Sequence, residues 1–157
     1  MVSIITFGLS YLATNAGERR QRMPVLSTEL GPGTLTIRNI GAGPAVNIAL
    51  AGAKGKLASE DLRMMRLTRR ALADDWESVQ WHLRPIPPGD QRRYHWNWSG
   101  ALGLSYTDAL GAPYTLVTSG HGSRVVDRAI MPDVGFPKMK YLPEARPGTA
   151  ARTADGE

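Results

Sequence analysis

The sequence contains no cysteine, and this absence excludes several kinds of chemistry. Disulfide bonds, cysteine-ligated zinc, iron–sulfur clusters and thiol catalysis all require that residue. Histidine is also scarce: His82, His95 and His121 are the only three. His82 and His95 are expected on outward faces of strands, where they could meet across a sheet, but no two histidines stand at metal-ligand spacing within one element. We therefore expect structural or exposed histidines, no metal site and no cofactor.

A long hydrophobic run is also missing. The chain opens with residues 1–14, MVSIITFGLSYLAT, which are uncharged and mostly apolar, and Arg19, Arg20 and Arg22 follow. A signal peptide carries its positive charges before the apolar run. Fourteen helical residues reach about 21 Å, whereas a spanning helix needs about 20 residues. The segment is therefore a span shortened by a misplaced start codon, an interfacial anchor, or a first strand or frayed end of the fold.

Among these interpretations we expect membrane association through residues 1–22. If the segment spans a bilayer, the arginines that follow it stay on the cytoplasmic side. The domain after them then lies in the cytoplasm. The alternative is a soluble cytoplasmic protein.

Acidic residues are fewer than basic ones, 14 against 19, and the net charge is +5. A basic protein can bind nucleic acid or anionic lipid. Here the arginines are dispersed along the chain, and the group at residues 63–70 is flanked by Glu60, Asp61, Asp74 and Asp75. This distribution favours a solvated surface over a nucleic-acid interface.

Glycine and proline are abundant, with 17 and 11 residues, and favour a turn-rich β protein. Residues 34–40 and 45–51 alternate apolar and polar side chains with a period of two. Such alternation is typical of half-buried antiparallel strands. The Gly41-Ala-Gly43-Pro44 sequence between them lacks the third glycine and the following helix of a dinucleotide-binding loop. It predicts a hairpin connection between the two strands.

Further strands follow from the same alternation and from the turn signals at 31–33, 85–90 and 108–111. They are expected at residues 23–26, 78–84, 94–98, 102–106, 114–116 and, as a strand or a cover, 124–130. Residues 52–77 interrupt this rhythm. Ser59 followed by two acids predicts a short helix over 60–73, with a charged excursion or an extra strand as alternatives.

The pattern predicts an all-β protein: an antiparallel immunoglobulin-like β-sandwich of about seven strands, with one short inserted helix and an apolar N-terminal segment. A small closed barrel is the alternative. The expected divisions are an apolar segment with a basic flank (1–22), the sandwich (23–142) and a disordered tail (143–157). The expected core comprises Leu35, Ile37, Val46, Ile48, Leu50, Val79, Trp81, Leu83, Leu102, Leu104, Tyr106, Tyr114 and Leu116.

Three runs of residues, LTIRNIGAGPAVNI, IPPGD and YTDALGAPY, resemble recurring marks of bacterial immunoglobulin-like sandwiches of the cell-adhesion-related (CARDB-like) kind. The chain resembles still more closely a group of uncharacterised bacterial single-span proteins. In that group a transmembrane helix precedes a basic stretch, an R-P-x-L strand and an N-x-G-x-G-P-A motif. Residues 22–26, RMPVL, match this strand with one residue inserted, and the resemblance covers residues 20–118. It implies a fold and an anchor, but no catalytic residues.

Two groups of side chains are candidates for a site. Ser123, His121 and Asp127 assemble a triad on paper, but no G-x-S-x-G elbow supports it, so we expect no enzyme. Tyr94, Trp96 and Trp98 share one face of a predicted strand and form either a ligand platform or part of the core; the core is favoured.

These residues lead to two alternative functions. The first is a non-enzymatic, membrane-associated interaction module that binds an unknown protein partner through an exposed face or strand edge. The alternative is a soluble carbohydrate-binding or other ligand-binding β-sandwich that uses the aromatic strand face.

Overall fold

The computed structural model describes residues 21–54, 75–97, 100–119, 122–126, 129–131 and 139–146. The chain is mostly β, and the helix expected at 60–73 lies outside the described residues. The regular elements within the described ranges are β1 (Leu26–Gly31), β2 (Thr34–Asn39), β3 (Val46–Ala53), β4 (Trp76–Leu83), β5 (Gln91–His95), β6 (Leu102–Thr107), β7 (Pro113–Ser119), β8 (Gly122–Val126) and β9 (Met139–Tyr141).

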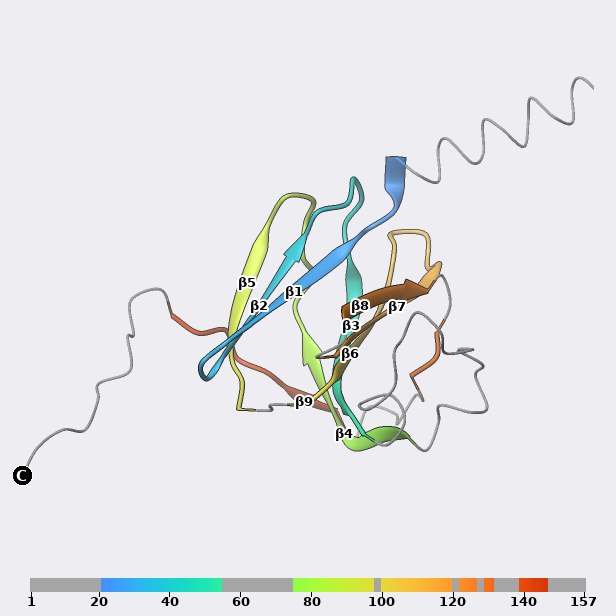
Figure 1. Ribbon diagram of the computed structural model, residues 1–157. Coiled ribbons are helices and arrows are strands. Elements are labelled where there is room, and N and C mark those ends of the chain that lie inside the picture. The colour runs from blue at the N-terminus through green and yellow to red at the C-terminus, as the bar shows by residue number, and fades with distance from the viewer. Residues whose placement is uncertain are drawn as a thin grey trace, which may run out of the picture.

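The described strands form two sheets, one with the order β1-β2-β5 and one with the order β8-β7-β6-β3-β4-β9 (Figure 1). Every pair is antiparallel except β4 with β9, which run parallel. The expectation of wholly antiparallel sheets is therefore wrong at this pair. A parallel pair needs a long connection, and β4 and β9 are far apart in the sequence, so no hairpin fixes their relative direction.

The glycine-rich connection after β2 does not form the expected hairpin. β2 pairs with β1 and β5, whereas β3 pairs with β4 and β6 in the other sheet. The chain therefore crosses from one sheet to the other through residues 40–45. It crosses back through residues 84–90, between β4 and β5. Both crossings consist of the proline- and glycine-containing segments that the sequence marked as turns.

The two sheets share one core. Leu35, Ile37 and Tyr94 from the smaller sheet pack in the same cluster as residues of the larger sheet, and all are buried. Most of the expected core is confirmed. The buried members of this cluster are Leu26, Leu35, Ile37, Ala45, Ile48, Leu50, Leu83, Ile86, Tyr94, Trp96, Leu102, Leu104, Tyr106, Tyr114, Leu116 and Leu142.

A second cluster covers the outer face of the six-stranded sheet. It consists of Ala49, Ala51, Ala53, Trp76, Ala101, Val117, Ile130 and Met131, with Met139 packed against it. The sequence pattern predicted a half-buried strand with Ala49 on the face opposite Ile48 and Leu50, and the expectation that this second face is solvated is wrong. The alanines of β3 are small enough to lie beneath larger apolar side chains, so β3 is buried on both of its faces.

The alternation expected in residues 78–84 is confirmed only in part. Leu83 is fully buried and Trp81 is half-buried against the shared core, but Val79 is 38% exposed. Gln80, expected to face outward, is buried. The three-stranded sheet is too narrow to cover the whole inner face of the six-stranded sheet, so Val79 stays exposed. The second cluster buries part of the outer face, on which Gln80 lies.

Two turns were predicted correctly. The β1–β2 hairpin has the two-residue loop Pro32-Gly33, and Gly33 has a φ of 65°. In the β6–β7 loop Gly111 has a φ of 86°. Glycine adopts this left-handed conformation without steric cost, which explains its place in both turns.

The described chain continues past residue 142, where the domain was expected to end. Glu144 forms an isolated bridge with Tyr94, and the Ala145 N–H donates to the Arg93 carbonyl at 2.7 Å. Residues 143–146 therefore lie along β5. The remainder of the tail, from residue 147, lies outside the described residues.

Candidate functional site

Asn39 is the organising side chain where the chain crosses between the sheets. It is fully buried at the end of β2. Its Nδ2 donates to the carbonyls of Gly43 at 2.8 Å and Ile86 at 2.9 Å. Its Oδ1 accepts from the N–H groups of Gly41 at 3.0 Å and Val25 at 3.3 Å. The full hydrogen-bonding capacity of one amide therefore joins both crossings to the segment before β1.

The two glycines of this connection allow backbones to approach closely. A Cβ at Gly41 would collide with the Met23 carbonyl, and a Cβ at Gly43 would collide with the carbonyl of Arg22. The Ala42 N–H donates to the Met23 carbonyl at 3.2 Å. The Gly-x-Gly sequence is therefore a packing motif that holds residues 22–25, and no helix follows it to bind a phosphate.

The aromatic residues considered as a ligand platform lie in the core where they are described. Tyr94 is fully buried, and Trp96 is 8% exposed. Both belong to the cluster that the two sheets share. Their burial excludes an exposed platform at these two positions, because neither ring faces solvent. Trp98 lies outside the described residues.

Burial also affects the acidity of the core tyrosines. Burial raises the pKa of Tyr106 to about 12. The pKa of Tyr94 is raised further, first by burial and then by the nearby Glu144 carboxylate. The rings of Tyr106 and Tyr114 stack with their centroids 5.7 Å apart. The hydroxyls of Tyr94 and Tyr106 are therefore neutral groups of the core at physiological pH.

The described histidines do not form a site, and the structure does not test the triad of Ser123, His121 and Asp127 that the sequence offers. His82 lies on β4 and His95 on β5, which belong to different sheets, so the two do not meet across one sheet as expected. Within the described ranges no group of three His, Asp or Glu side chains could hold a metal ion. Ser123 is exposed on β8, and His121 and Asp127 lie outside the described residues.

The outer face of the three-stranded sheet is polar, and we call it the polar face. Register aligns its side chains in rows across the strands: Ser27 with Arg38 and Gln91, Glu29 with Thr36 and Arg93, and Thr34 with His95. All are exposed or half-buried. Unlike the outer face of the larger sheet, this face carries no cluster of apolar side chains among the described residues.

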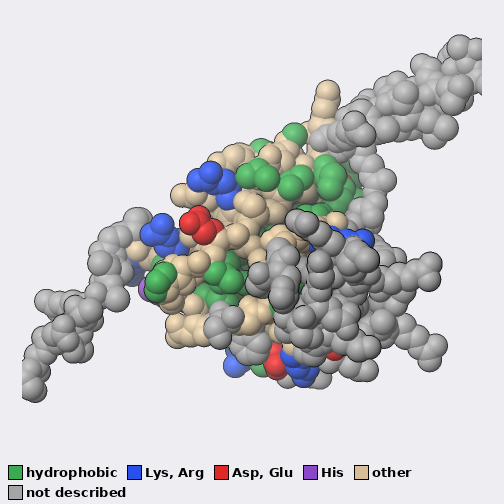
Figure 2. Space-filling model, in the orientation of Figure 1, with side chains coloured by type: hydrophobic (Ala, Val, Ile, Leu, Met, Phe, Trp, Pro, Cys, Tyr) green, Lys and Arg blue, Asp and Glu red, His purple; other side chains and the backbone are tan. Residues whose placement is uncertain are grey.

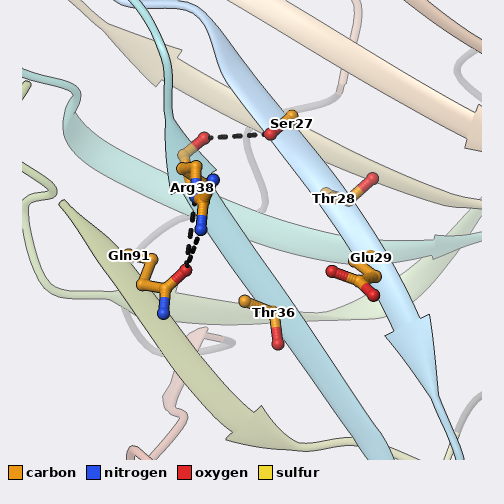
Figure 3. A pocket seen from close by; sticks show the side chains of 6 residues that line it. All are labelled: Ser27, Thr28, Glu29, Thr36, Arg38 and Gln91. Atoms are coloured by element: carbon orange, nitrogen blue, oxygen red, sulfur yellow. Dashed lines mark hydrogen bonds between the residues drawn. The ribbon is translucent and has the colours of Figure 1, made fainter. Parts of the chain in front are cut away.

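A shallow depression of 260 Å³ lies on the polar face (Figure 3). The Arg38 guanidinium donates to Gln91 Oε1 from Nη2 at 2.8 Å and from Nε at 3.2 Å. The side chain of Glu29 lies on the neighbouring strand. The depression therefore offers a cation, a carboxylate and neutral hydrogen-bonding groups within one small area. Its lining residues are Ser27, Thr28, Glu29, Thr36, Arg38 and Gln91.

The two edges of the smaller sheet differ. Residues 143–146 pair in part with β5, and Arg92 binds Asp90 at 2.9 Å and Glu144 at 3.5 Å. A depression of 380 Å³ lies along this edge and is bordered by Arg93. β1, at the opposite edge, pairs with β2 alone among the described strands.

The described residues contain no helix long and apolar enough to cross a membrane. Residues 1–14, on which the expectation of an anchor rests, lie outside that part of the chain. No family model matches the sequence, and no match was found among curated proteins or solved structures. The structure thus shows a β-rich protein with two sheets, while the sequence resemblance to single-span proteins stays a prediction.

Proposed function

We propose that the chain is a non-enzymatic interaction module: an immunoglobulin-like sandwich, held at a membrane through residues 1–22, that binds a protein partner on its polar face. One observation carries this proposal. The central part of the outer face of the six-stranded sheet is covered by Trp76, Ile130 and Met131, whereas the polar face of the smaller sheet presents exposed side chains such as Arg38 and Arg93.

The path of the chain supports an immunoglobulin-like arrangement. The connections β2–β3 and β4–β5 both pass from one sheet to the other, and the inner faces of the sheets share a core. Crossings of this kind are typical of Greek-key sandwiches. They fit the fold that the sequence resemblance implies.

The shape of the polar face favours a macromolecular partner. Its two depressions, of 260 Å³ at the centre and 380 Å³ along the β5 edge, are shallow and open, whereas a small-molecule pocket buries most of its ligand. The exposed side chains of Glu29, Arg38 and Gln91 offer charges of both signs and hydrogen-bonding groups across three strands. A broad, shallow and polar surface of this kind suits a protein that offers complementary charges.

The N-terminal sequence supports a membrane location. Residues 1–14 are uncharged and mostly apolar, and Arg19, Arg20 and Arg22 follow them. Under the positive-inside rule these arginines stay in the cytoplasm, so the domain and its partner are cytoplasmic.

Fractionation of cells that express the full chain tests the membrane part of the proposal. We expect the protein to stay in the pellet through an alkaline carbonate wash. The matched variant carries Ile5→Asp and Leu9→Asp, and we expect it to be released because two carboxylates oppose burial of the segment in lipid. Release of the unsubstituted protein by the wash would contradict the proposal and favour a soluble cytoplasmic module.

Photo-crosslinking tests the interaction surface. A photoreactive amino acid at Thr36, in the middle of the polar face, should give a discrete adduct with one protein. The control places the same amino acid at Lys140, which is exposed on β9 at the edge of the larger sheet farthest from β8. Equal adducts at both positions, or none at Thr36, would count against the polar face as the binding surface.

A further inference from the structure

Four segments meet at one end of the domain, which we call the N-terminal end (Figure 1). Asn39 at the end of β2 pairs with Leu26 at the start of β1, and Val46 at the start of β3 pairs with Thr107 at the end of β6. The described chain also begins here, and 20 residues precede Gln21. The four segments are residues 22–25, 40–45, 84–90 and 108–112.

This end carries the two most exposed large hydrophobic side chains of the described residues. Leu110 in the β6–β7 loop is 76% exposed, and Ile40 at the start of the β2–β3 connection is 62% exposed. Neither contributes to the core, and neither is required by its turn. The other exposed residues of these two loops are small or cyclic, namely Ala42, Ala109 and Gly111 beside Pro113.

Hydrogen bonds hold both side chains on ordered backbone. The carboxylate of Asp108 accepts from the N–H groups of Leu110 and Ala112, each at 2.9 Å. The Ile40 N–H donates to the Val25 carbonyl at 2.8 Å. The backbone that carries these two apolar side chains is therefore ordered. Their insertion into an apolar phase would cost little conformational entropy of the backbone.

The charges at this end suit an anionic surface. Its two carboxylates are already engaged: Asp90 pairs with Arg92, and the buried Asp108 caps its own loop. Arg22 is exposed, and so is Arg84, whose guanidinium also lies over the Tyr141 ring at 5.8 Å from its centroid. Figure 2 shows hydrophobic side chains along the upper edge of the molecule, at this end, and both acidic and basic side chains at the lower edge.

We infer that the N-terminal end is a lipid-binding surface, with Leu110 and Ile40 inserted between the headgroups of an anionic bilayer and Arg22 and Arg84 near the lipid phosphates. Apolar side chains flanked by arginine are typical of surfaces that lie in the membrane interface. This inference rests on the proposed membrane association and adds the orientation of the domain. The residues before Gln21 leave from the same end, so one bilayer accommodates both.

The absence of cysteine allows a direct test with the full-length chain. Ile40→Cys and Leu110→Cys each introduce a single thiol, which is labelled with the environment-sensitive fluorophore NBD. The matched control is Leu30→Cys, because Leu30 is also an exposed leucine, at 44%, but lies beside the β1–β2 turn at the opposite end. Vesicles of phosphatidylcholine with phosphatidylglycerol are added, and binding is measured separately by sedimentation.

We expect the NBD emission at positions 40 and 110 to rise and shift to shorter wavelength on binding, and that at position 30 to stay unchanged. Vesicles of phosphatidylcholine alone should give a smaller change, because they lack the anionic lipid. If the protein sediments with vesicles but no label responds, the inference that Ile40 and Leu110 contact lipid is wrong, while the proposed membrane association still holds. The two loops would then be available to bind a protein. If the protein does not sediment at all, the membrane part of the proposed function also fails.

Discussion

The central strands of the six-stranded sheet are buried on both faces, whereas the three-stranded sheet is buried on one. In β6, Leu104 points into the shared core, and its neighbour Gly103 lies beneath Trp76 on the other side. In β2, Ile37 points into the same core, but its neighbour Thr36 belongs to the polar face. The centre of the larger sheet is therefore an internal layer, and the smaller sheet presents side chains to solvent on the face where we propose that a partner binds.

This difference also decides where polarity alternates in the sequence. A strand with one solvated face shows a clear period of two, while a strand buried on both faces does not. β2 follows the first case, with the burial of its residues alternating from Leu35 to Asn39. β3 is buried on both faces from Ile48 to Ala53, and its period of two is an alternation of large side chains such as Ile48 and Leu50 with alanines.

The largest effect is expected from a charge placed in the shared core. Ile37→Asp and Leu104→Asp each replace a fully buried side chain, one in each sheet. The loss of apolar burial and the desolvation of an unpaired carboxylate cost about 5 kcal/mol or more together, which approaches the whole stability of a small domain. We expect both variants to be unfolded by circular dichroism. Thr36→Asp, one residue away on the polar face, is the control and should fold; a normal thermal melt of Ile37→Asp would contradict the assigned burial.

Local patterns in the sequence predicted most of the strands and turns, but they placed β1 at 23–26 instead of Leu26–Gly31 and β5 at 94–98 instead of Gln91–His95, and they did not predict β9. The alternation over 34–40, the Pro32-Gly33 turn and the Gly111 loop all have local physical causes, so they are visible without knowledge of the fold. The pairing of strands is not local. A glycine- and proline-rich connection looks the same whether it forms a hairpin or passes to another sheet, and for this reason the crossing at residues 40–45 was missed.

The candidate site shows the same limit. Aromatic side chains at alternate positions fit a platform or a core equally well, and only the position of β5 over the larger sheet places Tyr94 in the core. The signal for the proposed lipid-binding surface was present in the sequence but was not used. Ile40 lies at the end of the expected strand 34–40, on the face opposite Leu35 and Ile37, and Leu110 lies in a segment that otherwise consists of turn formers.

The second largest effect is expected at Asn39, which joins the two sheets. Asn39→Ala removes the hydrogen-bond partner of four backbone groups. Two of these hydrogen bonds, to the carbonyls of Gly43 and Ile86, are buried. Buried polar groups without partners cost about 1–3 kcal/mol each, so we expect a loss of about 3–5 kcal/mol in the free energy of urea unfolding. Asn39→Asp is the matched variant: it keeps the oxygen that accepts from Gly41 and Val25 but loses the N–H groups that donate to Gly43 and Ile86. It should therefore also destabilise the fold. A loss below about 1 kcal/mol for Asn39→Ala would show that the crossings do not depend on this amide.

Alkaline pH tests the core that the two sheets share. The pKa of Tyr106 is about 12 in the folded protein, compared with 10.0 for a tyrosine in the unfolded chain, so folding favours the neutral phenol. Its contribution to stability is complete below pH 10 and is lost as the pH rises toward 12, by about 3 kcal/mol in total. We expect phenolate absorbance of Tyr94 and Tyr106 to appear together with loss of the β-sheet circular dichroism signal. Tyr106→Phe should unfold at higher pH; ionisation of Tyr94 and Tyr106 with the sheet signal intact would contradict their burial.

The smallest effects compare the two outer faces directly. A Cβ at Gly103 would collide with the ring of Trp76 and lie 3.5 Å from Met131 Sδ. Gly103→Ala should therefore displace Trp76 and cost about 1–3 kcal/mol, as overpacking of a core does. Thr36→Ala on the polar face should stay within about 0.5 kcal/mol of the unsubstituted protein, because its neighbours are already solvated. Urea unfolding followed by tryptophan fluorescence measures both. Equal costs for the two variants would mean that Trp76 does not cover the larger sheet, and the contrast that assigns partner binding to the smaller sheet would lose its basis.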